Sequence, residues 1–96
     1  MNNNQENWIY ELQQGNPEAF RLLVEEYQHL VYNTVLSIVQ NEADAEELTQ
    51  DVFVQAYRSV GGFKGDAKLS TWLYRIATRK ALDHLRRQKA KKRLAW

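Results

Sequence analysis

The chain has 96 residues, 44% of them hydrophobic, and this size allows one domain with a single small core. It contains no cysteine, which excludes disulfides and thiolate metal sites, and no apolar stretch is long enough for a transmembrane helix. The formal net charge is only +1, but residues 1–50 carry −8 and residues 51–96 carry +9. This division of charge indicates a nucleic acid at the basic end and a protein partner for the acidic part.

Two amphipathic helices are expected first, separated by a Gly-Asn-Pro turn. The first spans residues 5–14 and directs three apolar side chains inward: Trp8, Ile9 and Leu12. Gly15 ends it, Asn16 is the N-cap of the next helix, and Pro17 is its first residue. The second helix spans residues 17–40 and has an apolar stripe of Phe20, Leu23, Val24, Tyr27, Leu30, Val31, Val35 and Ile38. A second apolar stripe consists of Tyr32, Leu36 and Val39. It predicts that other helices pack on two sides of this helix, which is then the central one.

The third helix is expected to begin with Asp44, which has capping-box spacing to Glu47, and to end at Gly61 and Gly62. One face carries its apolar residues: Leu48, Val52, Phe53, Ala56, Tyr57 and Val60. The opposite face carries carboxylates, an amide and one isolated valine: Glu47, Gln50, Asp51, Val54 and Arg58. Such a face is typical either of a docking surface for a basic or helical partner or of an ordinary solvated surface.

A loop and a long basic helix follow. Residues 63–69, FKGDAKL, have no period and contain the turn formers Gly65 and Asp66, so we expect a loop. Ser70 is the expected N-cap of a helix that runs from Thr71 into the basic tail, with residues 89–93 frayed into solvent. No strand is expected. The predicted fold is all-α, a compact bundle of four helices with a long C-terminal helix.

The last helix carries the sharpest functional pattern. At 100° per residue, about one third of its circumference gathers Trp72, Arg75, Ile76, Arg79, Asp83 and Arg86. Guanidinium groups at this spacing can follow a phosphate backbone, and an aromatic ring at the helix start can stack on an unpaired base. The alternative places Trp72 in the core and leaves the arginines only to solubilise the helix. The charge of the C-terminal half favours nucleic acid.

The loop before this helix adds two cations and an aromatic ring. Lys64 and Lys68 lie beside flexible backbone, and Phe63 at the loop start can line a pocket for an extruded base. Phe63 can equally plug the core, so the loop alone does not decide between these roles.

No arrangement typical of catalysis is found. His29 and His84 fall on different helices with no obvious acid or nucleophile arrangement, and the adjacent Glu46 and Glu47 diverge by 100° on a helix. The sequence has no glycine-rich phosphate loop. We therefore expect a binding module without a cofactor or metal, and not an enzyme.

Two strings are similar to a known family: DAEELTQDVF at residues 44–53, and STWLYRIA at residues 70–77, followed by TRKALDHLRR. With the GNPEAF helix start before them, they resemble region 2, the promoter-melting domain of bacterial RNA polymerase sigma factors, and most closely the extracytoplasmic-function (ECF) type. The resemblance covers nearly the whole chain. It implies one domain at 1–96 that binds core RNA polymerase and recognises and melts the −10 promoter element, with residues 87–96 starting a linker.

The resemblance also implies site residues and partners. The residues expected to contact the coiled coil of the largest polymerase subunit are Glu47, Leu48, Gln50 and Asp51. The residues expected to hold the non-template strand of −10 DNA are Phe63, Lys64, Lys68, Leu69, Ser70, Trp72, Arg75, Ile76, Arg79 and Lys80. Family members of this type are usually held inactive by an anti-sigma factor, so we expect such a partner. The expected location is the cytoplasm, which also suits the lack of cysteine.

Two departures from the family pattern matter. Many relatives carry an aromatic residue where this chain has Leu69, which weakens the expectation of base stacking there. Relatives also continue into a second, helix-turn-helix domain that reads the −35 element. The present sequence stops at Trp96, so we expect that second contact to be missing.

Two other functions remain open from the residues alone. A homeodomain-like module would bind duplex DNA more tightly than single strands, although the tight turn before its recognition helix is missing here. A protein–protein adaptor would have negligible affinity for any DNA, even at low salt.

Overall fold

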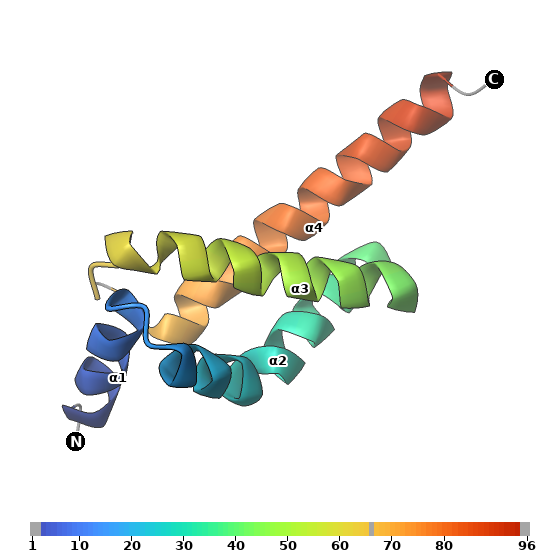
Figure 1. Cartoon of the computed structure of the whole chain (residues 1–96). Helices are drawn as coiled ribbons and strands as arrows, with labels where there is room; N and C mark the ends of the chain where they lie inside the picture. The colour runs from blue at the N-terminus through green and yellow to red at the C-terminus, as the bar shows by residue number, and fades with distance from the viewer. Residues whose placement is uncertain (1–2, 66, 95–96) are drawn as a thin grey trace.

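The computed structural model describes residues 3–65 and 67–94, and in them it shows four α-helices (Figure 1). They are α1 (Asn3–Gln13), α2 (Pro17–Val39), α3 (Glu42–Ser59) and α4 (Leu69–Leu94), and a short 3-10 turn, η1 (Val60–Gly62), follows α3. The prediction of an all-α bundle with a long C-terminal helix is confirmed. Within these two stretches, no helix is long and apolar enough to cross a membrane.

The central helix is α2, as predicted, because it packs against α1, α3 and α4. Its packing against α4 contributes to the core, as does the packing of α3 against α4. Three residues of α4 in this core have no exposed surface: Leu73, Ala77 and Ala81. The predicted α2 stripe supplies the other half of this core, with Leu23, Val31 and Val35 fully buried.

Two apolar residues expected in the core lie at the surface instead. Leu30 on α2 is exposed, and Tyr57 on α3 is 50% exposed. Tyr57 packs edge-on against Phe20, with the ring centroids 5.2 Å apart, and so covers the core from outside. A helical projection cannot show how far the neighbouring helix reaches, so it assigns residues at the edge of a stripe to the core.

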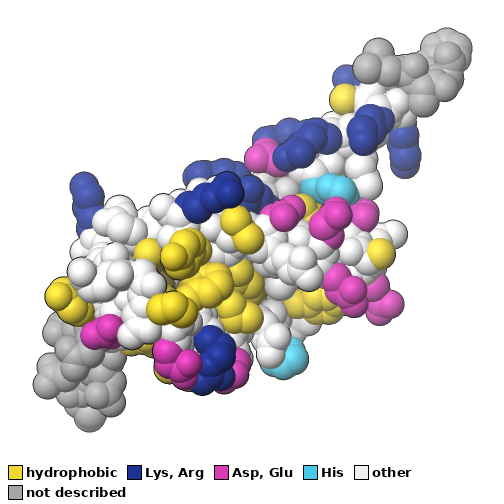
Figure 2. All heavy atoms as spheres, in the orientation of Figure 1, with side chains coloured by type: hydrophobic (Ala, Val, Ile, Leu, Met, Phe, Trp, Pro, Cys, Tyr) yellow, Lys and Arg dark blue, Asp and Glu magenta, His cyan; other side chains and the backbone are white. Residues whose placement is uncertain are grey.

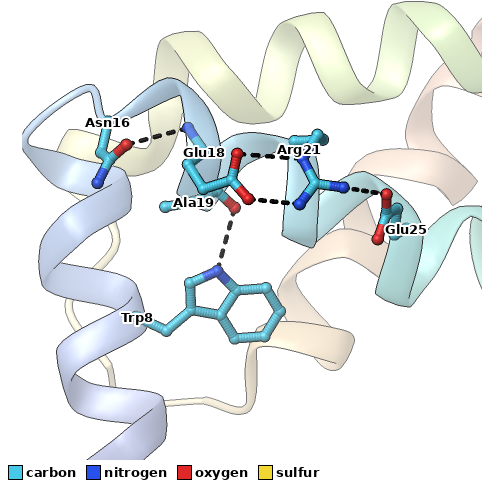
Figure 3. Close-up of polar contacts among 6 residues, drawn as sticks. All are labelled: Trp8, Asn16, Glu18, Ala19, Arg21 and Glu25. Atoms are coloured by element: carbon cyan, nitrogen blue, oxygen red, sulfur yellow. Dashed lines mark hydrogen bonds and ion pairs between the residues drawn. The ribbon is translucent and has the colours of Figure 1, made fainter.

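The turn between α1 and α2 forms as predicted. Gly15 has a φ of +79°, a left-handed conformation that favours glycine. The Asn16 side chain accepts a hydrogen bond from the backbone N–H of Glu18 at 3.0 Å, as an N-cap does (Figure 3). The indole N–H of Trp8 then donates to the carbonyl of Ala19 at 3.1 Å, which fixes α1 against the first turn of α2.

The start of α3 differs from the prediction. Its N-cap is Asn41, whose side chain accepts a hydrogen bond from the backbone N–H of Asp44 at 2.9 Å. Asparagine caps helices as well as aspartate does, so the sequence offered two candidates three residues apart. Because the Asp44 carboxylate is not used as a cap, it reaches α4 and lies 3.1 Å from Nε2 of His84 and 3.3 Å from Nε2 of Gln88.

The bounds of α4 also correct the prediction. The helix begins at Leu69, not after Ser70, and the backbone N–H of Trp72 donates to the carbonyl of Lys68 at 3.0 Å. At the other end, residues 89–93 are helical instead of frayed. They contain good helix formers and no glycine or proline, and their cations favour a helix C-terminus. This end of α4 projects from the rest of the molecule (Figure 1). The molecule as a whole, including this end, measures 55 × 22 × 21 Å.

Candidate nucleic-acid interface

A ridge of arginines runs along the exposed side of α4. We define the arginine ridge as Arg75, Arg79 and Arg86, which are spaced by four and seven residues, are all exposed, and lie opposite the buried Leu73 and Ala77. Figure 2 shows the Lys and Arg side chains gathered in a band along α4 and its projecting end, with most Asp and Glu side chains away from that band. The ridge therefore presents positive charge to solvent along one helix face.

Trp72 lies at the edge of this ridge and is partly buried. Its ring packs against the ring of Phe63, with centroids 5.1 Å apart and a tilt of 48°. It also borders a groove of about 340 Å³ between α3 and α4, together with Gln55, Arg79 and Lys80. A partly exposed aromatic ring beside two cations can stack on a base while the cations hold its phosphate. Trp72 therefore packs against the core with one part of its ring and keeps another part accessible from this groove.

The structure corrects the role expected of two residues in the DNA-binding set. Phe63 is 6% exposed and Leu69 is 1% exposed, so neither side chain offers a surface on which a base could stack. Phe63 takes the second of its two expected roles, a core plug, and supports Trp72 from beneath. Leu69 is buried because it occupies the first turn of α4, on the side that faces the core.

The remaining members of the predicted DNA-binding set have surface to offer. Lys64 and Lys68 are exposed beside the ridge, and Ser70, Ile76 and Lys80 are partly exposed. Gly65 has the left-handed φ of +76° that the predicted turn requires, whereas Asp66 lies outside the described residues. The two lysines of this segment thus lie next to the N-terminal end of α4, where Trp72 also lies.

The predicted docking face on α3 is exposed, with one exception. Its exposed residues are Glu47, Gln50, Asp51, Val54 and Arg58, and the Val54 side chain is 47% exposed. Leu48 was expected in the polymerase-binding set but is only 7% exposed. It lies on the core side of α3 and can position this face without contributing much contact area to it.

An apolar groove borders this face and was not predicted. It has a volume of about 630 Å³ and lies between α2 and α3, with Val24, Tyr32, Phe53 and Val54 in its walls and Glu46 at its edge. Val24 and Tyr32, which belong to the stripes predicted to be buried, are only partly buried and line this groove. The isolated Val54 was the signal that could have indicated a further apolar surface here.

The acidic half of the chain keeps its negative charge toward solvent. Arg21, its only base, donates hydrogen bonds to Glu18 and Glu25 on the same helix, including one of 3.1 Å from Nε to Glu18 (Figure 3). The bond to Glu18 raises the pKa of Arg21, and the same bond lowers the pKa of Glu18. Arg21 therefore stays charged and is paired with two carboxylates of its own helix.

Comparison with known proteins decides the family. The model of the sigma-70 region 2 family matches residues 23–91, which include most of α2, all of α3 and most of α4. The chain belongs to the sigma-70 region 2 family. A region 2 domain of a sigma factor is not an enzyme, in agreement with the expected binding module.

Similar proteins place this region 2 domain among the ECF sigma factors. It is 40% identical over 77 residues to RNA polymerase sigma-H factor of Pseudomonas aeruginosa and to ECF RNA polymerase sigma-E factor of Escherichia coli. It is 35% identical over 81 residues to ECF RNA polymerase sigma factor SigW of Bacillus subtilis. These alignments cover 80% to 84% of this chain but only 40% to 43% of the relatives' length. The predicted resemblance to ECF sigma factors is confirmed.

One solved structure has the same fold. It is the NMR structure of an engineered region 2 of sigmaE in complex with GTAAAA, with a TM-score of 0.81 and 38% sequence identity. The alignment covers 88% of this chain and 87% of that one. The likeness therefore extends over nearly the whole domain, including the elements that carry the arginine ridge.

Proposed function

We propose that this region 2 domain binds core RNA polymerase through the exposed face of α3 and captures the unpaired non-template strand of a −10 promoter element on α4. The observation that carries the DNA part is the partly exposed Trp72 beside Arg79 and Lys80 in one groove. The engineered region 2 of sigmaE, which has the same fold, was solved in complex with GTAAAA, which supports a DNA ligand here.

The proposed mechanism is capture of a base, without chemistry. Taking one base out of a DNA stack costs a few kcal/mol, and stacking it on a protein aromatic ring returns roughly 1 to 3 kcal/mol. One aromatic site therefore about balances the cost. The domain alone should bind single-stranded −10 DNA weakly and melt duplex poorly, and polymerase should supply the remaining contacts.

The polymerase part of the proposal rests on the charge and shape of α3. Glu47, Gln50 and Asp51 are exposed together, and Val54 beside them opens into the apolar groove between α2 and α3. Carboxylates around an apolar groove fit a helix with basic and apolar residues, as the coiled coil of the largest polymerase subunit would offer. An anti-sigma factor, a cytoplasmic location and a linker beginning at residues 87–96 are further parts of this proposal.

A salt series with three DNA ligands tests the DNA part. We expect tighter binding to single-stranded −10 DNA than to the same sequence as a duplex, with a steep decline as salt rises. A scrambled single strand is the control. Tighter binding to duplex would support the homeodomain-like alternative, and negligible binding to every DNA at low salt would support the adaptor.

A further inference from the structure

The end of α1 is tied to the base of the DNA-facing loop, although α1 lies before the residues that match the family model. The side-chain amide of Gln13 donates to the carbonyl of Phe63 at 3.0 Å and approaches the carbonyl of Val60 at 3.4 Å. An amide nitrogen has two hydrogens, so one side chain can serve both acceptors. The shorter of these two contacts is the stronger one.

The segment that Gln13 holds is a glycine-containing turn between two buried core residues, Val60 and Phe63. It consists of η1, whose last two residues are Gly61 and Gly62, and both glycines have open space where a side chain would begin. Glycine loses more conformational freedom on folding than any other residue. Contacts from neighbouring elements are therefore needed to hold this turn in one conformation. The support within the turn is the backbone bond from the N–H of Phe63 to the carbonyl of Val60 at 3.0 Å.

Phe63 links this turn to the proposed DNA site. Its carbonyl is held by Gln13, its ring packs against Trp72, and the exposed Lys64 follows it directly. A shift of the Phe63 backbone would therefore move both the ring beneath Trp72 and the start of the cationic loop. Gln13 itself lies on another helix, and its contact with the proposed DNA site is the bond to the Phe63 carbonyl.

We infer that Gln13 is a positioning residue for strand capture, which holds the base of the loop so that Trp72 and Lys64 are preorganised for an unpaired strand. This inference rests on the proposed function. It gives α1 a role in DNA binding that does not require α1 to touch DNA.

Matched variants of neighbouring glutamines test this inference in the 96-residue chain. Gln13→Glu keeps the shape but replaces the donor by a carboxylate, whereas Gln13→Lys keeps a donor. Gln14→Glu and Gln14→Lys make the same charge changes at an exposed neighbour whose side chain makes no hydrogen bond in the described part of the chain. Binding is measured with the labelled single strand GTAAAA, and binding to core polymerase is measured in parallel.

We expect Gln13→Glu to weaken GTAAAA binding about fivefold relative to Gln14→Glu, since a buried acceptor would lose its donor. Gln13→Lys should stay within about twofold of Gln14→Lys, because its ammonium can replace the amide. Polymerase affinity should not change in any of the four variants. Hydrogen exchange at the Phe63 amide should be faster in Gln13→Glu than in Gln14→Glu, with equal exchange in the centre of α2.

Equal DNA affinities of the two Glu variants would overturn the inference, and so would a loss in Gln13→Lys as large as that in Gln13→Glu. If Gln13→Glu unfolds, as judged by circular dichroism, Gln13→Ala and Gln14→Ala replace the Glu pair, and equal GTAAAA affinities of these two variants would overturn the inference. Failure of the proposed function would look different, because the wild-type chain itself would then bind GTAAAA no better than a scrambled strand.

Discussion

Trp72 and Arg79 border the same groove, but we expect them to bind DNA through different forces. Trp72→Ala removes a stacking surface worth roughly 1 to 3 kcal/mol, so affinity for single-stranded −10 DNA should fall at least about fivefold at every salt concentration. Arg79→Ala removes a phosphate contact, so its loss should be largest at low salt and should reduce the salt slope by about 0.7. Fluorescence anisotropy with a labelled strand measures both effects.

Arg58→Ala is the control for this pair, because Arg58 is exposed on the face of α3 and not on the arginine ridge. It should leave both the affinity and the salt slope nearly unchanged. Losses below about 0.3 kcal/mol in both Trp72→Ala and Arg79→Ala would make this part of α4 structural instead.

Asp51 tests the other proposed surface at the same scale. Asp51→Lys reverses a charge in the exposed face of α3, and a basic partner helix would then meet a like charge. Affinity for core polymerase, measured by pull-down or by surface binding, should fall about tenfold or more, while affinity for single-stranded DNA should not decrease. Glu26→Lys, an equal charge change on the exposed surface of α2, is the control. Unchanged polymerase affinity in Asp51→Lys would remove this assignment.

At the scale of the elements, α3 and α4 are joined by a polar contact between Asp44 and His84, whose side chains are 29% and 22% exposed. Asp44→Ala and His84→Ala should each reduce the free energy of unfolding by about 1 kcal/mol. The double variant should lose less than the sum, with a coupling of about 0.5 kcal/mol or more in urea denaturation. The cap Asn41 should show no such coupling to His84, since it bonds only within α3. Additive losses for Asp44 and His84 would contradict the contact.

Most elements could be predicted because their signals are local. The apolar period of α2, the Gly-Asn-Pro turn and the presence of a long C-terminal helix all follow from neighbouring residues, and the structure confirms them. The misses depended on distant partners. The Asp44 side chain contacts α4, Tyr57 covers Phe20 of α2 from outside and stays half exposed, and Phe63 packs against Trp72. Spacing along one helix does not contain this information.

The same limit applies to the site. The arginine ridge and the exposed face of α3 follow from 100° projection, and the structure places them on the surface as expected. The groove between α2 and α3 and the bond from Gln13 to Phe63 each join segments that are far apart in the sequence. They become visible only when the helices are packed together.

At the scale of the whole molecule, the two proposed binding surfaces lie on adjacent helices that share one core. Residues of both helices are fully buried in it, among them Val52 of α3 and Leu73 of α4, and Asp44 adds a polar link between the two. A partner bound to α3 would therefore hold α4 at a fixed angle. This arrangement suits a domain that is weak alone and effective when polymerase positions it.

The opposite signs of charge on α4 and on the rest of the chain also give the molecule a large electric dipole moment (Figure 2). In the field of DNA, such a molecule turns during diffusion until its positive side leads. In many encounters α4 would then contact the DNA first. The carboxylates of α3 would point away from the DNA, because its phosphates repel them.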